Sequence, residues 1–294
     1  MTHSNAVDIM MIGHFSKDRL VIDEQVEICS GGAIYYGSIP LRHQGLSVAV
    51  VTRMAETDVH FLDEMKEEGI EVFVSESPVS SSIENIYHSA DMERRICKLR
   101  SFAGPFQKED IPDIAARVIL VVPVIAGEVD LALLQWLAER GPVGLDVQGF
   151  VRVPEGGDLV FHQWPEVAEG LACVTYLKVD RAEAELLTGK TDLRAAAREL
   201  AAYGPREVVV TQSSGVTVYA GGQFYEAPFT PRSLAGRTGR GDTCFATYVG
   251  QRLNTSPEEA TRFAAAVTTL KQEKPGPWRG TPDDVAALLA GQRP

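Results

Sequence analysis

The chain has 294 residues, of which 45% are hydrophobic and 23% charged, and its formal net charge is -12. This composition excludes a wholly disordered chain, and an acidic balance without a basic stripe argues against nucleic acid as a partner. No apolar run approaches the roughly 18 residues of a membrane span, and no apolar signal segment follows the polar start, so we expect a cytoplasmic protein with no membrane partner.

In chain order, the first part of the sequence alternates strands and helices. Residues 7–12 are apolar and end at Gly13, which predicts a buried first strand. Residues 20–28 alternate apolar and polar positions, which predicts one strand with a wet face. A helix should follow Gly31-Gly32 and continue to residue 43. Next come a strand, a helix and a strand, predicted at residues 47–51, 59–68 and 71–74.

Residues 83–90 and 93–99 interrupt this order, because both alternate and together indicate a β-hairpin. The strand and helix order then resumes. Further buried strands are predicted at residues 118–122, 143–146, 174–178 and 207–211, an antiparallel pair at 215–219 and 223–226, and helices at 130–139, 183–187, 193–203, 242–253, 257–270 and 282–289.

This order predicts one α/β unit over residues 1–294, with a central, mostly parallel sheet flanked by helices in three layers. A small β excursion is expected beside it, built from about residues 14–30 and 83–102. Exposed strands of that excursion could pair between two copies, so a homodimer through it is one option and the oligomeric state stays open.

One fragment imitates the end of a phosphate-binding P-loop, namely Gly189-Lys190-Thr191. The complete pattern requires glycine five residues before Gly189, where this chain has Ala184, and it requires a preceding strand where a helix is predicted. We therefore interpret Gly189 as the end of a helix.

The strongest local signal is Gly239-Arg240-Gly241-Asp242, just before a predicted helix. A glycine turn leading into a helix gathers backbone N–H groups and the positive end of the helix dipole, which suits a phosphate. Asp242 beside this anion hole is placed to take a proton from a hydroxyl that attacks phosphorus. The alternative is that Asp242 only caps the helix while the glycines form a tight turn.

A second candidate region follows the predicted strand 143–146. Ligands of open α/β sheets bind beyond the carboxyl ends of strands, so Asp146, Gln148 and Arg152 are candidates for the acceptor site. The alternative is a polar loop in which Asp146 caps the local backbone. His14 is a weaker candidate for contact with substrate, and for Tyr36 packing inside a helix is the commoner role.

On these residues the chain resembles the ribokinase-like, or pfkB-type, family of carbohydrate kinases along essentially its whole length. The resemblance implies an anion hole at Gly239, Arg240 and Gly241, with Asp242 as catalytic base. It also implies that an acceptor hydroxyl is bound by Asp18 and by the double glycine Gly31-Gly32. The β excursion resembles the lid of the family.

The same resemblance implies ATP as donor together with Mg²⁺. The segment 180–183 resembles the family's N-x-x-E motif, which positions magnesium through water and phosphate contacts, and Glu183 matches its glutamate. The segment 211–215 resembles the nucleotide loop, so the expected nucleotide-binding residues are Thr211, Ser213, Gly215, Glu183, Gly239 and Gly241. We expect this loop and residues 264–268 to border the adenine.

The chain also departs from the family pattern at three positions. Tyr36 stands where many members carry Asn, and Gly236 stands where many carry the Asp of a monovalent-cation site. Arg240 replaces a small residue in the anion hole, where it contacts phosphate, recognises a charged acceptor or, as is commonest for Arg, faces solvent. The acceptor and the cation requirement therefore stay open.

We predict an ATP-dependent small-molecule kinase that transfers the γ-phosphoryl group to a hydroxyl of a sugar or cyclitol. One alternative is a kinase of the same fold that acts on a nucleoside or heterocyclic alcohol. Another is a non-catalytic regulator that binds a nucleotide or a sugar.

Overall fold

The large sheet defines the architecture of this computed structural model, which describes residues 6–23, 25–88 and 91–292. In this part of the chain, nine strands pair in the order β15-β14-β13-β12-β9-β8-β1-β4-β5. All neighbours from β13 to β5 are parallel, and β14 and β15 are added antiparallel. The strands are β1 (Ala6–Ile12), β4 (Val48–Met54), β5 (Glu71–Glu76), β8 (Ala115–Val121), β9 (Val143–Asp146), β12 (Tyr176–Asp180), β13 (Glu207–Gln212), β14 (Gly215–Ala220) and β15 (Gln223–Pro228).

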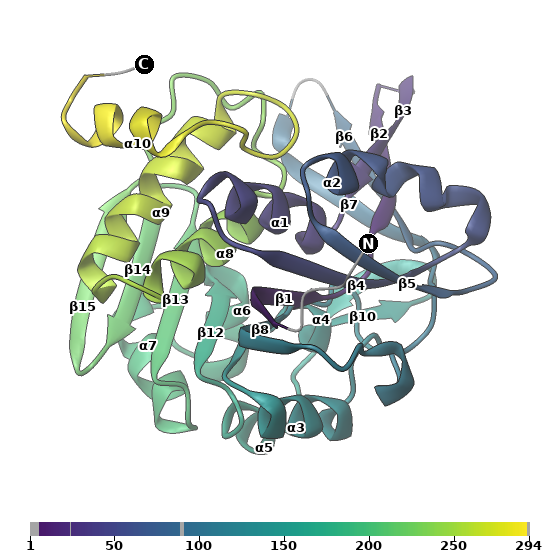
Figure 1. The fold of residues 1–294 in the computed structure, drawn as a ribbon, viewed down its shortest axis with the longest axis horizontal. Helices are drawn as coiled ribbons and strands as arrows, with labels where there is room; N and C mark the ends of the chain where they lie inside the picture. The colour runs from purple at the N-terminus through teal and green to yellow at the C-terminus, as the bar shows by residue number, and fades with distance from the viewer. Residues whose placement is uncertain (1–5, 24, 89–90, 293–294) are drawn as a thin grey trace.

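Helices cover both faces of this sheet, which confirms the predicted three layers (Figure 1). In β1, Ile9 and Met11 pack into one core, and Met10 and Ile12 pack into the other. The first core is covered by α1 (Ala33–His43), α8 (Arg240–Arg252) and α9 (Pro257–Gln272). The second is covered by α3 (Leu131–Arg140), α5 (Val167–Leu171), α6 (Arg181–Thr188) and α7 (Leu193–Ala202), while α10 (Pro282–Leu289) packs on α9.

A second, smaller sheet stands beside the first, in the order β10-β11-β7-β6-β2-β3. Figure 1 shows its strands β2, β3, β6 and β7 rising on the side where α1 begins. Three separate stretches of chain build it. They contribute β2 (Ser16–Ile22) with β3 (Gln25–Gly31), β6 (Ser82–His88) with β7 (Asp91–Ser101), and β10 (Arg152–Glu155) with β11 (Asp158–Phe161).

Two local predictions are wrong. The single strand expected at residues 20–28 is an antiparallel pair that turns next to Asp23, whose φ of 44° lies in the left-handed region that Asp tolerates better than most residues. The helix expected at residues 59–68 is a 3-10 helix, η1 (Glu56–Leu62), followed by the short α2 (Asp63–Glu67). In both places the spacing of apolar residues continues through a point at which the backbone changes direction or helix type, so the spacing alone predicts one longer element.

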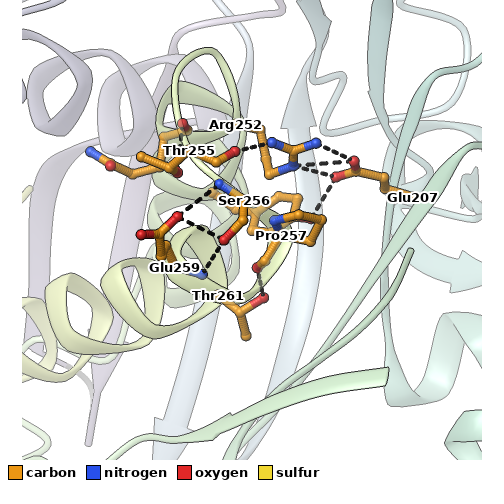
Figure 2. Close-up of polar contacts among 9 residues, drawn as sticks. Glu207, Arg252, Thr255, Ser256, Pro257, Glu259 and Thr261 are labelled. Carbon is orange, nitrogen blue, oxygen red and sulfur yellow. Dashed lines mark hydrogen bonds and ion pairs between the residues drawn. The ribbon is translucent and has the colours of Figure 1, made fainter. Parts of the chain in front are cut away.

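Polar contacts fix the last residue of α8 and the first turn of α9 (Figure 2). At the last residue of α8, Arg252 donates to both carboxylate oxygens of Glu207 in β13, with N–O distances of 2.8–3.1 Å. Helix α9 begins with a capping box, in which Ser256 and Glu259 hydrogen bond to each other's backbone N–H and Pro257 follows directly. Among the described residues, no helix is long and apolar enough to cross a membrane.

Candidate active site

A cleft of about 460 Å³ lies where the carboxyl ends of the parallel strands face the small sheet. It brings together most of the residues that the sequence predicts for the site. Those lining it are Asp18, Gly32, Gln148, Arg152, Thr211, Ser213, Gly239, Arg240, Gly241 and Asp242. Residues from sequence positions 18 to 242 thus converge on one space, as expected for a site outside the strand ends.

The glycine motif forms the start of α8. Gly239 adopts a left-handed φ of 76°, and a Cβ on it would lie 2.1 Å from Cγ of the Tyr36 ring, so only glycine allows the ring to pack here. No backbone carbonyl among the described residues accepts from the N–H groups of Gly239 or Gly241. These amides and the helix dipole therefore form an anion-binding corner.

Lys178 completes this corner, although the sequence analysis missed it. It lies in β12 and is 3% exposed, and its Nζ donates to Asp146 Oδ1 at 3.0 Å and to Glu183 Oε2 at 3.4 Å. A Cβ on Gly241 would lie 3.8 Å from that Nζ, so the ammonium stands beside the anion hole. A lysine in the middle of an otherwise apolar strand is the signal that could have found it.

Lys178 is a permanent cation in this site. Burial acts to lower the pKa of Lys178, but the carboxylates of Asp146 and Glu183 outweigh it and hold that pKa above its ordinary value. Burial raises the pKa of both Asp146 and Glu183, and the Lys178 ammonium that the two carboxylates share acts in the opposite direction without outweighing it.

Glu183 lies behind the cleft wall. Its Oε2 accepts from the N–H of Asp180 at 2.6 Å, and the N–H of Glu183 donates to Asp180 Oδ1 at 2.8 Å, which makes the capping box of α6. Together with the Lys178 contact, these bonds engage the carboxylate that the resemblance assigns to magnesium. Among the described residues, no three His, Cys, Asp or Glu side chains cluster as a metal site. Glu183 itself does not line the cleft, so it can reach a magnesium ion there only indirectly, as the resemblance implies, whereas Asp180 does line the cleft.

The double glycine lets α1 begin directly against Asp18. A Cβ on Gly31 would lie 2.4 Å from Asp18 Oδ2, and Gly32 has a φ of 92° with the carbonyl oxygen of His14 2.5 Å from its would-be Cβ. Asp18 Oδ1 accepts from the N–H of Ile83 at 3.3 Å. The small sheet thus holds the Asp18 carboxylate in place, while Gly31 itself does not line the cleft.

The far end of the cleft is polar. The segment after β9 is the one-turn helix α4 (Gln148–Val151) and not an open loop, and Asp146 Oδ1 accepts from the N–H of Gln148 at 3.0 Å. Arg152 is 6% exposed and donates to Cys97 Sγ at 3.4 Å. Asn85 of β6, which the sequence analysis did not single out, lines the same end. These amide and guanidinium groups suit a ligand with several hydroxyls.

Other candidate residues lie outside the cleft. Gly215 is inside the β14–β15 pair, where a Cβ would lie 2.5 Å from the carbonyl oxygen of Ala227. Residues 264–268 of α9 are buried in the cores. His14 is buried and hydrogen bonds to Ser81 Oγ through Nδ1 at 2.7 Å. Lys190 pairs with Glu199 at 3.1 Å, in agreement with the rejection of a P-loop.

The comparisons with known proteins agree with this geometry. A family model described as pfkB family carbohydrate kinase matches residues 4–284. A pyrophosphate-dependent kinase in the ribokinase family, solved with sulfate, is 40% identical, with a TM-score of 0.88 over 92% of this chain and 97% of that chain. A comparison with curated proteins gave no match.

Two further structures are equally similar. One is a pyrophosphate-dependent kinase in the ribokinase family complexed with a pyrophosphate analog and myo-inositol, at 38% identity and a TM-score of 0.88 over 96% of this chain and 99% of that chain. The other is a pyrophosphate-dependent myo-inositol-1 kinase converted into a myo-inositol-3 kinase by two substitutions, at 38% identity and a TM-score of 0.87 over 97% and 99%. On this match, the chain belongs to the pfkB family of carbohydrate kinases and is a phosphotransferase that acts on an alcohol group.

Proposed function

We propose that this protein is a pyrophosphate-dependent kinase that phosphorylates a hydroxyl of myo-inositol or a closely similar cyclitol. The proposal takes pyrophosphate in place of the ATP that the sequence resemblance implies. Support comes from the relatives at 38–40% identity, which are pyrophosphate-dependent kinases, and from the donor half of the cleft.

The donor half of the cleft is the observation that carries the choice of donor. Three cations line it, Lys178, Arg237 and Arg240, together with the hydroxyls of Thr211 and Ser213. Such a lining suits a compact polyanion, because each phosphate oxygen can meet a cation or a hydroxyl.

A purine base would need apolar surface on both faces, and this half of the cleft offers little of it. Among the described residues that line the cleft, Leu234 is the one apolar side chain in the segment 234–242 that carries the anion hole. Residues 264–268, expected from the sequence to border adenine, are at most 5% exposed. This burial favours a donor without a nucleoside.

The chemistry follows from the order of groups along the cleft. Asp242 takes the proton of the acceptor hydroxyl, whose oxygen forms a bond to the nearer phosphorus of pyrophosphate. The bond from that phosphorus to the bridging oxygen breaks, and its electron pair leaves with inorganic phosphate. The amides of Gly239 and Gly241 and the Lys178 ammonium stabilise the charge on the transferring phosphoryl group.

The acceptor half supports a polyhydroxyl substrate. Asp18 accepts hydrogen bonds, Arg152 donates them, and Asn85 and Gln148 can do both, so hydroxyls on several sides of a ring can be bound. Tyr36 also lines the cleft, where its ring packs on Gly239.

The test is a matched comparison of donors and acceptors. Purified protein is given myo-inositol with either pyrophosphate or ATP, and then pyrophosphate with ribose or adenosine, and the product is identified by phosphorus NMR. We expect kcat/KM with pyrophosphate to exceed that with ATP by at least about 100-fold, or about 2.7 kcal/mol of transition-state stabilisation.

The Asp242→Asn protein supplies the background rate. Equal or better use of ATP would return the donor to the one implied by the sequence resemblance. Phosphorylation of adenosine in preference to myo-inositol would contradict the cyclitol proposal.

A further inference from the structure

A buried lysine supports the glycine motif from behind. Lys271 of α9 is 2% exposed, and its Nζ donates to the backbone carbonyl oxygens of Gly236 and Thr238. The same ammonium lies 4.8 Å from the centroid of the Tyr36 ring. The two carbonyls belong to the turn that leads directly into Gly239.

This lysine is unusual in its partners. Burying an ammonium costs several kcal/mol unless a carboxylate pairs with it, and no ion pair of Lys271 occurs among the described residues. Burial lowers the pKa of Lys271 to about 8, and the nearby Asp242 carboxylate acts in the opposite direction. Because this ammonium is bound by neutral carbonyl groups despite the cost of burial, we infer that it has a role in the structure of the turn at residues 236–238.

The dipoles of the two carbonyl groups indicate what this role is. Two carbonyl oxygens that converge on one point repel each other unless a cation stands between them, as in protein sites for alkali cations. Here the ammonium fills that point. The orientation of the Gly236 and Thr238 peptides therefore depends on Lys271, and these peptides set where the chain enters the anion hole.

Gly236 excludes the other way of holding a cation here. A Cβ on Gly236 would lie 1.7 Å from the carbonyl oxygen of Lys274 and 2.8 Å from that of Lys271, so no aspartate side chain fits at this position. The aspartate-built cation site of many relatives is thus not compatible with this turn.

We propose that the Lys271 ammonium is a built-in substitute for a monovalent cation, so that phosphoryl transfer by this protein needs no added potassium. Lys271 acts through the turn at residues 236–238 and is a positioning residue. The inference rests on phosphoryl transfer to an alcohol and does not depend on which donor is used.

The first test uses the wild-type protein. Turnover is measured with myo-inositol and either pyrophosphate or ATP, in potassium, sodium or tetramethylammonium chloride at one ionic strength. The expected result is the same turnover in all three salts. Strong activation by potassium over tetramethylammonium would overturn the proposal, whether or not any Lys271 variant folds.

The second test removes the ammonium. Lys271→Met is expected to lose at least about ten-fold in kcat, equal to about 1.4 kcal/mol of transition-state stabilisation, and potassium or ammonium ions should restore part of it while tetramethylammonium, too large for the gap, should not. Lys274→Met is the matched control, because Lys274 is exposed just beyond the same helix and should leave kcat unchanged. A loss of kcat in Lys271→Met that no cation restores would reject the substitution idea and leave only a packing role.

A thermal-melting measurement separates this inference from the proposed function. Potassium should raise the Tm of Lys271→Met more than tetramethylammonium does, and should not do so for the wild type. If the wild type shows no turnover with either donor, the proposed substrates are wrong, and the Tm comparison still decides the role of Lys271. Equal effects of the two salts on the Tm of Lys271→Met would count against it.

Discussion

At the scale of single residues, Asp242 is not the cap of α8. The cap position is Gly239, and Asp242 is the third residue of the helix, with its side chain on the cleft wall. A carboxylate at this place can stabilise the helix through its dipole, but it is also the group beside the anion hole. The two roles are separable, because a proton acceptor is lost in Asn while the shape is kept.

Asp242→Asn should therefore lower kcat by at least about 100-fold, the lower range for a general base, with Tm and the KM for the donor nearly unchanged. Steady-state kinetics and thermal melting check this. Asp284→Asn is the matched control, since Asp284 occupies the same third position of α10 and does not line the cleft. Near-wild-type turnover of Asp242→Asn would make Asp242 structural.

Lys178 carries a prediction of a different kind. Lys178→Met leaves Asp146 and Glu183 facing each other without their cation, which should cost about 3–5 kcal/mol of unfolding free energy as well as turnover. Adding Asp146→Asn and Glu183→Gln removes the stranded charges and should recover most of the Tm. Because the ammonium beside Gly241 is still missing, turnover should stay low; a triple variant with wild-type kcat would show that Lys178 only holds the fold.

At the scale of elements, the contact between α1 and α8 sets the anion hole. The Tyr36 ring of α1 packs on Gly239, and the backbone carbonyl oxygen of Tyr36 accepts a hydrogen bond from Thr243 Oγ1 at 3.0 Å. Any side chain at residue 239 would have to displace the ring. The two helices therefore together determine the shape of the corner around Gly239, where we propose that phosphate binds.

Gly239→Ala should lower both Tm and kcat/KM for the donor. Its control is Gly156→Ala, because Gly156 also has a positive φ, of 60°, but has no atom within 4 Å of a would-be Cβ. The control variant should lose only about 1 kcal/mol of unfolding free energy, the cost of a side chain at a positive φ, and should keep its activity. Equal losses in both variants would mean that the Tyr36 contact is unimportant.

The elements also show what a single sequence can and cannot predict. The strands of the large sheet are apolar runs such as residues 118–122, so they and the Gly239 motif could be predicted. The small sheet could be predicted only in part, because β3 exposes Val26 and Ile28 and its turn at Asp23 has no glycine signal. Lys178 and Lys271 were missed because burial of a lysine is a property of the tertiary structure.

At the scale of the whole molecule, a buried histidine joins the two sheets. His14 follows β1 of the large sheet. Its backbone N–H donates to Glu128 Oε2 at 2.9 Å, and its ring Nδ1 hydrogen bonds to Oγ of Ser81, which directly precedes β6 of the small sheet. The rings of Phe102 and Phe106 lie 5.4 and 5.1 Å from the His14 ring. Burial lowers the pKa of His14 below its ordinary 6.5, although the Glu128 carboxylate acts to raise it.

The sign of the pH effect follows. Below pH 6.5 the unfolded chain protonates His14 while the folded protein resists, so the unfolded state binds more protons and stability falls as the pH falls. The loss of Tm between pH 7 and about pH 5.5 should be smaller in His14→Gln than in the wild type. His162→Gln, whose side chain is 51% exposed, should follow the wild type. An unchanged pH profile in His14→Gln would exclude this histidine as the cause.

The small sheet also limits when the site can form during synthesis of the chain, because its strands come from three separate stretches. Strand pairing places Arg19 opposite Glu84 and Lys98 opposite Asp158, so the small sheet is not complete until the third stretch has been synthesised. The anion hole, at residues 239–242, emerges later still. A nascent chain that ends before residue 239 therefore lacks the anion hole, and recovery of turnover during refolding reports the completion of contacts between distant parts of the chain.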